Sequence, residues 1–319
     1  MKKVISIIIF TLFLTISTVV VADNKANFDI NLQDNQLNNI KNINITFESE
    51  NYTLYGQIFY PSESGLYPGI VFCEGLAGYS EAYNWIPKAL AEQGYVALFF
   101  DFPGQGRSEG IFGNRSISIP FLNFYLRFSA FLEPCFHYFR GDFVIVTMDA
   151  ITYLTNESPV RNLVDSEKLG LIGHSLGSVI VTETAAQDSR VKTVVALSVG
   201  NNLLIDKINV PIQFQGGGLD IPIVGLPIIL LRCYSKANTP KELIMIKHGT
   251  HIGFTSAFGK LCLCPRWQKE ICLKYVTGWF DYFLKNKSEA YDNITNDSDH
   301  LSKILRSRYN FGYGEHILK

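Results

Sequence analysis

The sequence lacks an excess of charge of either sign. Its 319 residues include 28 Lys and Arg against 29 Asp and Glu, which gives a formal net charge of -1. No stretch is basic enough for nucleic-acid binding, so no nucleic-acid partner is expected. Internal repeats and low-complexity tracts are also missing, which excludes a solenoid. With 47% apolar residues, the chain suits one large globular domain.

The sequence also lacks the marks of a metal or cofactor site. Residues 101–108 are rich in glycine, but they lack the Gly-Lys-Ser/Thr ending of a phosphate-binding loop, so we interpret them as a structural turn. Cys262-Leu263-Cys264 has no histidine at metal-ligand spacing. We therefore expect neither a metal nor an organic cofactor.

Long apolar runs are rare, and the N-terminus carries the main one. Lys2 and Lys3 precede the apolar run 4–21, and Val20-Val21-Ala22 presents small residues suited to signal peptidase. This pattern predicts a signal peptide at 1–22, cleaved after Ala22, and an extracytoplasmic protein. An uncleaved membrane anchor is the alternative. A lipid anchor is not expected, because no cysteine follows the run.

Export gives the six cysteines a possible structural role. Cys73 falls inside an apolar run and is expected to be a buried free thiol. In an oxidising compartment, Cys233, Cys262, Cys264 and Cys272 could form two disulfides, and their spacing leaves the pairing open.

Apolar strands alternate with helices between residues 45 and 285, the predicted domain. This order predicts an α/β fold with a mostly parallel central sheet and helices on both faces. Residues 23–44 form a polar lead-in, and the structure of the tail, 286–319, is left open. We expect strands at 44–48, 54–60, 68–73, 95–100, 168–172, 191–197, 210–215 and 243–246, and helices at 81–93, 142–154, 178–186 and 267–284.

One motif carries the chemistry, Gly173-His174-Ser175-Leu176-Gly177. It fits the G-x-S-x-G elbow, in which a serine occupies a strained turn between a strand and a helix. Glycines two residues to either side keep the strand and helix from colliding. Ser175 is therefore the candidate nucleophile.

A serine nucleophile needs a base and an acid that orients the base. In this fold they follow in the order Ser, Asp, His. Asp220 comes just after the strand 210–215 and His251 just after 243–246, so both lie where catalytic loops belong. The predicted roles are orienting carboxylate for Asp220 and general base, then acid, for His251.

The rival candidates are weaker. His248 lies nearer to its strand end, whereas the wider loop brings His251 back over the serine. Asp206 precedes its strand instead of following it. His174 is expected to point away from the nucleophile, and the remaining histidines default to solvated or core residues: His137, His300 and His316.

An oxyanion hole requires two backbone N–H groups. Leu176, the residue after the nucleophile, supplies one. The turn after the strand that ends at Cys73 should supply the other, with Leu76 as the best donor.

These motifs together resemble α/β-hydrolases of the dienelactone hydrolase and bacterial cutinase-like (polyester hydrolase) group. The resemblance covers residues from about 50 to 285, and it implies an esterase that works through an acyl-enzyme. The short spacing from Ser175 to Asp220 and His251 leaves no room for a large cap. The resemblance to this group also rests on these sequence segments: Tyr67-Pro-Gly-Ile-Val, Leu90-Ala-Glu-Gln-Gly-Tyr-Val, Asp101-Phe-Pro-Gly-Gln-Gly-Arg-Ser-Glu-Gly, Val164-Asp165, Asn209-Val-Pro-Ile and Gly249-Thr-His-Ile-Gly-Phe.

The sequence departs from that group at two places. Ser178 stands where many relatives have another glycine, a small and tolerable change. An aromatic-rich insertion at about 111–141 and the apolar run 221–231 are the larger departure. One hypothesis makes both segments an apolar lid or lining above Ser175, and the alternative packs them into the core or rests them on a membrane surface.

The sequence thus predicts a secreted serine hydrolase that cleaves carboxylic esters, including lipid or other apolar acyl esters. A peptidase or amidase, or an acyltransferase, would use the same triad. A non-catalytic hydrolase fold that binds a lipid or a partner is the alternative from another class.

Overall fold

The computed structural model describes residues 39–76, 78–110, 133, 137–138, 140–220, 226–256 and 266–291. The predicted signal peptide at 1–22, the cysteines 262 and 264, and residues 292–319 lie outside this set. So do the residues 221–225 and most of the lead-in and of the aromatic insertion. Within the described ranges, no helix has the length and apolar character needed to span a membrane.

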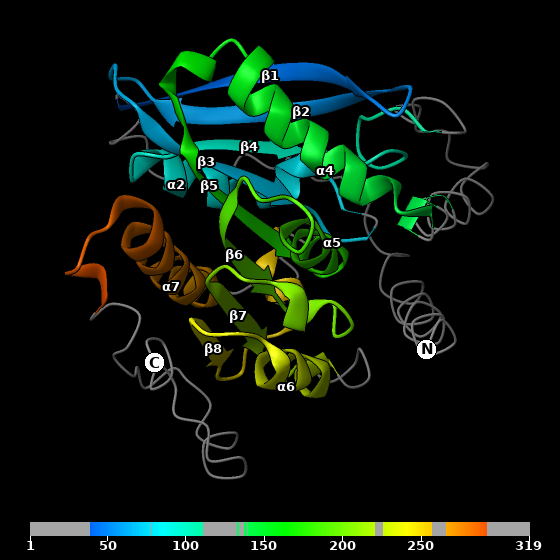
Figure 1. Ribbon diagram of the computed structural model, residues 1–319, viewed down its shortest axis with the longest axis vertical. Helices are drawn as coiled ribbons and strands as arrows, with labels where there is room; N and C mark the ends of the chain where they lie inside the picture. The colour runs from blue at the N-terminus through cyan, green and yellow to red at the C-terminus, as the bar shows by residue number, and fades with distance from the viewer. Residues whose placement is uncertain are drawn as a thin grey trace.

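An eight-stranded sheet runs through the centre of the molecule in the order β1-β2-β4-β3-β5-β6-β7-β8 (Figure 1). β1 and β2 pair antiparallel, as do β2 and β4, and the other pairs are parallel. This is the mostly parallel α/β sheet that the sequence predicted. The strands are β1 Ile40–Ser49, β2 Tyr52–Pro61, β3 Tyr67–Cys73, β4 Val96–Phe100, β5 Val164–His174, β6 Val191–Leu197, β7 Ile212–Gly217 and β8 Lys241–Ile246.

Helices cover both faces of the sheet, with α4, α5 and α6 on one side and α2 and α7 on the other (Figure 1). On β7 the two faces are easy to separate. The ring of Phe214 meets Tyr234 of α6 edge to face, whereas Gln213 bonds to the backbone of Tyr275 in α7. The helices are α2 Trp85–Glu92, α4 Asp142–Thr152, α5 Leu176–Ala185, α6 Leu226–Lys236 and α7 Arg266–Lys285.

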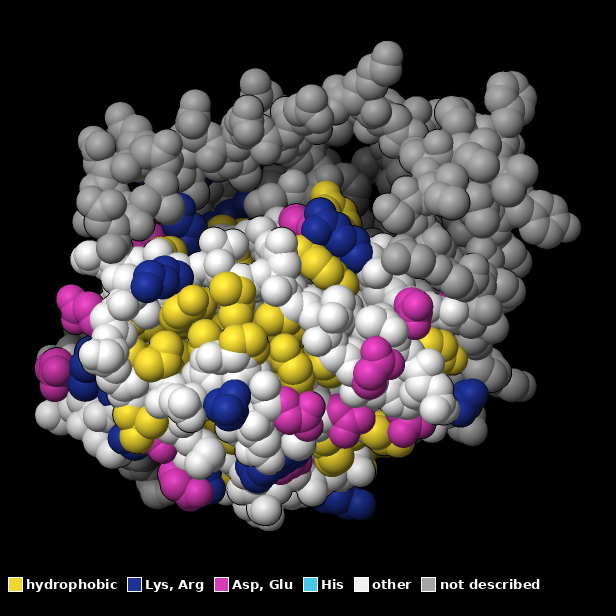
Figure 2. All heavy atoms as spheres, turned by 90° about the horizontal axis from the view of Figure 1, so that it is seen from above, with side chains coloured by type: hydrophobic (Ala, Val, Ile, Leu, Met, Phe, Trp, Pro, Cys, Tyr) yellow, Lys and Arg dark blue, Asp and Glu magenta, His cyan; other side chains and the backbone are white. Residues whose placement is uncertain are grey.

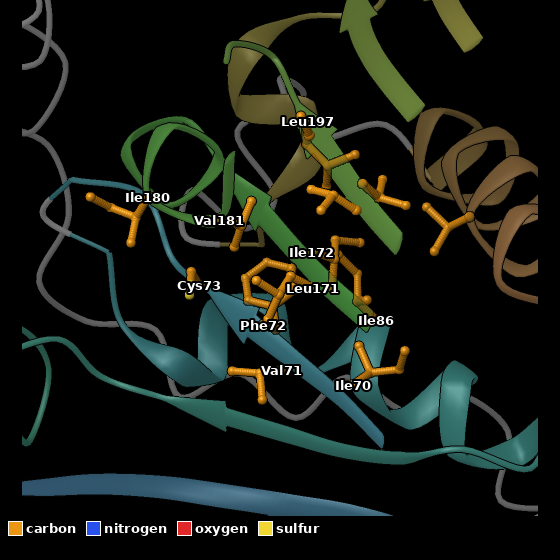
Figure 3. Close-up of a cluster of buried hydrophobic side chains, with 14 of the residues drawn as sticks. Ile70, Val71, Phe72, Cys73, Ile86, Leu171, Ile172, Ile180, Val181 and Leu197 are labelled. Carbon is orange, nitrogen blue, oxygen red and sulfur yellow. The ribbon is translucent and has the colours of Figure 1, made fainter. Parts of the chain in front are cut away.

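The core lies between these layers and is continuous across the parallel strands. Strands covered on both faces need apolar side chains at successive positions, and β4 is buried along its whole length. Neighbouring side chains of β3 and β5 pack together at its centre, as Figure 3 shows for Ile70, Val71, Phe72, Leu171 and Ile172.

The antiparallel end of the sheet is more exposed. β1 pairs with β2 along its whole length, from Ile40 opposite Pro61 to Ser49 opposite Tyr52. Figure 2 looks down on this end, where apolar side chains form a patch ringed by charged ones. Because the ladder extends to Ile40, residues 40–44 belong to a strand, which corrects the boundary of the predicted polar lead-in. The partner strand holds these polar residues extended.

Several element bounds differ from the prediction by one or two residues, and two differences are larger. β5 begins at Val164, because Val164 and Asp165 pair with Tyr67 and Pro68 at the start of β3, ahead of a register shift. The helix expected at 81–93 is divided into a 3₁₀ turn, η2 Ser80–Tyr83, and α2. Both differences lie at element ends, where hydrogen bonding to a partner outweighs residue preference.

Helix α6 was not expected, and it occupies part of the apolar run 221–231. In its described part, Leu230 and Leu231 are buried, while Ile228 is 52% exposed. These buried leucines agree with core packing, the alternative to a lid. The part at 221–225 remains a prediction.

The disulfides that the spacing allowed are not formed at Cys233 and Cys272. Both thiols are free and buried, and the Sγ atom of Cys233 donates to the Gly200 carbonyl at 3.3 Å. Burial raises the pKa of Cys233 to about 12 and raises that of Cys272 further, so neither is a reactive thiolate. Cys73 is a buried free thiol, as predicted.

The parallel strands end along one edge of the sheet. The register sets Cys73 beside Phe100 and Gly173, and His174 beside Leu197. Loops that follow these residues therefore meet at the same edge, and the predicted site residues follow four strands, β3, β5, β7 and β8.

Candidate active site

Ser175 occupies a sharp turn between β5 and α5. Its φ of 55° and ψ of -116° lie outside the regions that a residue with a side chain prefers, a strain of about 1–3 kcal/mol. The flanking glycines make the turn possible, because a Cβ on Gly173 would clash with the Gly177 carbonyl and one on Gly177 with the Cys73 carbonyl. The Ser175 N–H is anchored on the Leu197 carbonyl at 3.0 Å. The turn thus presents a half-buried serine at the strand edge.

His251 meets this serine. It opens a short 3₁₀ turn, η6 His251–Phe254, beyond the end of β8. Its Nε2 atom lies 3.0 Å from Ser175 Oγ, and its Nδ1 atom lies 3.2 Å from Asp220 Oδ2. A carboxylate only accepts, so Nδ1 carries the proton and Nε2 accepts from the serine hydroxyl. This is the tautomer that a general base requires.

Asp220 is almost fully buried, in the loop after β7. That loop is tied to the one that carries His251. The Leu219 N–H donates to the Gly249 carbonyl at 2.9 Å, and the Gly218 N–H donates to the Ile246 carbonyl at 2.8 Å. The backbone of both loops therefore fixes the approach of Asp220 to His251.

The rivals lie elsewhere. His248 is exposed, with a φ of 57°. Asp206 is exposed in a 3₁₀ turn before β7. His137 is a core residue whose Nδ1 atom lies 2.7 Å from Asp142 Oδ2. His300 and His316 fall outside the described residues.

The turn expected to complete an oxyanion hole lies against the serine. The Gly78 N–H donates to the Gly75 carbonyl at 2.9 Å, and a Cβ on Gly75 would stand 3.3 Å from that of Ser175. Leu76 is half-buried in this turn. Leu176 is the first residue of α5, where N–H groups have no partner within the helix. The turn that carries Leu76 and the first residue of α5 thus both lie next to Ser175.

Two buried carboxyl groups brace this region, and the sequence did not single them out. Glu74 accepts from the Phe102 N–H at 3.1 Å and from Gln105 Nε2 at 2.9 Å. Asp101 accepts from the Ser80 and Arg107 N–H groups. Burial, followed by the charge of Asp101, raises the pKa of Glu74 well above its usual range, and burial raises that of Asp101 to about 6.

His174 is a further residue whose contacts were missed. Its Nε2 atom lies 3.1 Å from the His251 carbonyl oxygen, and its Nδ1 atom lies 2.8 Å from the Tyr83 hydroxyl. Burial, and then the neighbouring His251, lower the pKa of His174 well below its usual range. The ring is therefore neutral, with Nε2–H donating to the carbonyl and Nδ1 accepting from the tyrosine.

No cluster in the described part of the chain has three or more His, Cys, Asp or Glu residues placed to hold a metal ion. The chemistry available at this edge is that of a hydroxyl, an imidazole, a carboxylate and backbone N–H groups. Such a set can attack a carbonyl carbon and stabilise the resulting oxyanion.

Comparisons with known proteins agree with the geometry. A family model described as the alpha/beta hydrolase fold matches residues 68–215. The match includes Ser175 and the turn around Leu76, and it ends before Asp220 and His251.

Curated relatives are distant. The chain is 26% identical to the bis(hydroxyethyl) terephthalate hydrolase of Streptomyces coelicolor over 148 residues, which are 46% of this chain and 38% of that protein. It is 29% identical to the hydrolase LUC6 of a Fusarium species over 163 residues, 49% of this chain and 33% of the relative. An uncharacterized 31.7 kDa protein of Escherichia coli is 28% identical over 131 residues, 41% of this chain and 36% of that protein. The matches thus span well under half of each relative.

Proposed function

The chain belongs to the α/β-hydrolase superfamily, and from that premise we propose that it is a serine hydrolase of carboxylic esters. One observation carries the proposal: Ser175 Oγ lies 3.0 Å from His251 Nε2, while His251 Nδ1 faces Asp220 at 3.2 Å. The relative named for a terephthalate ester supports the choice of an ester as the substrate class.

In the proposed mechanism, Ser175 Oγ attacks the ester carbonyl carbon as its proton passes to His251 Nε2. The carbonyl oxygen becomes an oxyanion, which accepts from the N–H groups of Leu176 and Leu76. His251 then gives the proton to the departing alcohol, which leaves an acyl group on Ser175. Water attacks that acyl-enzyme in the same way, and the carboxylic acid is released. Asp220 keeps the proton on Nδ1 and stabilises the charged imidazole.

The rest of the assignment concerns where the protein works and on which esters. We propose that the chain is exported through the signal at 1–22 and that its substrates are esters of apolar acyl groups.

Ester hydrolysis is distinguished from amide hydrolysis by a matched pair of probes, a p-nitrophenyl ester and the p-nitroanilide of the same acid. We expect turnover of the ester and at least about tenfold less of the anilide, whose leaving group is harder to expel.

Labelling by a fluorophosphonate probe tests the nucleophile. The wild-type protein should become labelled, and Ser175→Ala should not, with esterase activity lost about 10⁵-fold. Ser198 offers a matched control, because it is a second serine with positive φ, 78°, at the end of β6. Ser198→Ala should still label. An unlabelled wild-type protein, or a labelled Ser175→Ala variant, would contradict the proposal.

A further inference from the structure

The turn that carries His251 rests on a buried glutamine of α7. Gln268 is the third residue of that helix and has no exposed surface. A fully buried amide is costly unless all its polar atoms find partners, and it gains nothing that an apolar residue of the same size would not supply. A buried amide at this position therefore indicates that its hydrogen bonds have a specific role.

Both polar atoms of the Gln268 side chain are bonded to the residue before His251. Oε1 accepts from the Thr250 N–H at 3.0 Å, and Nε2 donates to the Thr250 carbonyl at 2.9 Å. The Thr250 N–H belongs to the peptide unit that joins it to Gly249, and its carbonyl to the unit that joins it to His251. One rigid amide thus fixes the planes of two consecutive peptide units, and the second of these leads directly into His251.

The turn is shaped around this amide. Gly253 lies so close to it that a Cβ there would overlap the Gln268 side chain. The Gly253 N–H donates to Thr250 Oγ1 at 3.1 Å, which closes the turn over the glutamine. Since η6 has only four residues and 3₁₀ geometry, its own hydrogen bonds hold it weakly. Such a turn needs hydrogen bonds from another element, here α7, to hold a side chain in one orientation.

We propose that Gln268 is a positioning residue for the reaction, one that sets the direction of the His251 imidazole between Asp220 and Ser175. The inference rests on the proposed function, in which that imidazole moves protons. Those transfers depend on contacts of 3.2 Å and 3.0 Å, and a misplacement of about 1 Å can reduce a rate about a hundredfold. His174 holds the other side of the same residue, through the His251 carbonyl.

The test removes the two bonds while keeping the volume. Gln268→Met should lower kcat and kcat/KM together, by about ten- to a hundredfold on a p-nitrophenyl ester, with KM changed less than about threefold. Gln213→Met is the matched control. Gln213 is equally buried and also bonds to a backbone carbonyl, but that carbonyl belongs to Tyr275, in the middle of α7. This control should lose stability and keep kcat within about threefold for the folded protein.

A second variant decides the matter if Gln268→Met does not fold. In Gln268→Glu, the protonated carboxyl can accept from the Thr250 N–H and donate to its carbonyl, as the amide does, whereas the ionised form can only accept. The titratable residue of η6 is His251. Within about one turn of Gln268, α7 carries Arg266, Lys269, Glu270 and Cys272, and all of these groups are shared with the wild-type protein. The ratio of variant to wild-type kcat should therefore fall at least about tenfold as pH rises from acid to alkaline.

The outcomes separate this inference from the proposed function. If the wild-type protein hydrolyses no ester and takes no fluorophosphonate label, the proposed function fails. If the wild-type protein is active and Gln268→Met keeps the kcat of Gln213→Met, or the Gln268→Glu ratio stays flat with pH, the positioning role is overturned.

Discussion

Two clusters of polar side chains lie on or next to strands β7 and β8, and they differ in what they do. The strand-end cluster is Ser175, Asp220 and His251, gathered beyond the ends of β5, β7 and β8. The strand-middle cluster is Glu242, Gln213 and Gln215, within β7 and β8 under α7. In the second, Gln213 Nε2 donates to Glu242 Oε2 at 2.6 Å, and Gln215 Nε2 donates to Gln213 Oε1 at 2.7 Å.

The clusters are alike in that each holds a buried carboxyl group whose hydrogen bonding is incomplete. Each contains a buried carboxyl oxygen that has no hydrogen-bond partner among the described residues, Oδ1 in Asp220 and Oε1 in Glu242. They differ in where their bonds end. The strand-middle bonds end on the backbone of α7, at Tyr275 and Cys272, whereas the strand-end bonds converge on one half-buried hydroxyl. Buried polar groups therefore serve packing in one place and the proposed nucleophile in the other, and position along the strand separates the two.

The largest effect expected on this comparison comes from the histidine. His251→Gln removes the proposed base, which would accept the serine proton, so kcat/KM on a p-nitrophenyl ester should fall about 10⁵-fold. The exposed His248, three residues earlier, is the control, and His248→Gln should stay within about threefold of wild type. If His248→Gln lost activity and His251→Gln kept it, His248 would be the base and the strand-end cluster would not be catalytic.

A smaller loss is expected from the carboxylate. Asp220→Asn keeps the volume but no longer favours the proton on His251 Nδ1, so kcat should fall about 10³- to 10⁴-fold. Asp206→Asn, a change at the exposed rival, should leave kcat unaltered. Steady-state kinetics with both variants checks this prediction. Equal losses of kcat in the two variants would show that negative charge near the site, and not the hydrogen bond to His251, determines the rate.

Much of this arrangement could be predicted from local patterns. Continuous apolar runs locate the buried strands β3 to β6, because strands covered on both faces leave no other choice. The elbow around Ser175 is also local, since its glycines and serine are adjacent in sequence. The approximate positions of Asp220 and His251 follow from strand order.

Other features depend on contacts that no local pattern reveals. Lys41, Asn42 and Asn44 read as a polar lead-in, yet the ladder to β2 holds them in a strand. Gln268 is one polar residue in an amphipathic helix, and only the tertiary fold sets it beneath Thr250. Similarly, the spacing of Cys233 and Cys272 suggested disulfides, whereas packing against different partners leaves both as core thiols.

The smallest effect on activity is expected in the strand-middle cluster, where the change should appear in stability. Burial raises the pKa of Glu242 well above its usual range. The unfolded chain releases this proton at about pH 4.3, so between that pH and the raised pKa the folded state binds more protons. The stability that this carboxyl contributes is thus complete below about pH 4.3 and is lost as pH rises through the folded pKa.

Glu242→Gln removes that titration and should separate structural burial from catalysis. Its melting temperature relative to wild type should rise between about pH 5 and about pH 8, by a stability difference of about 1–3 kcal/mol, while kcat/KM stays within about threefold. Glu167→Gln, at an exposed position in β5, is the control and should track the wild-type curve at both pH values. Three further described carboxyls have pKa values raised by burial, Glu74, Asp101 and the half-buried Glu183; they are present in all three proteins and cancel in the comparison. If the stability of Glu242→Gln has the wild-type pH dependence, this carboxyl is ionised in the folded state. If Glu242→Gln loses kcat/KM, the strand-middle cluster also contributes to catalysis.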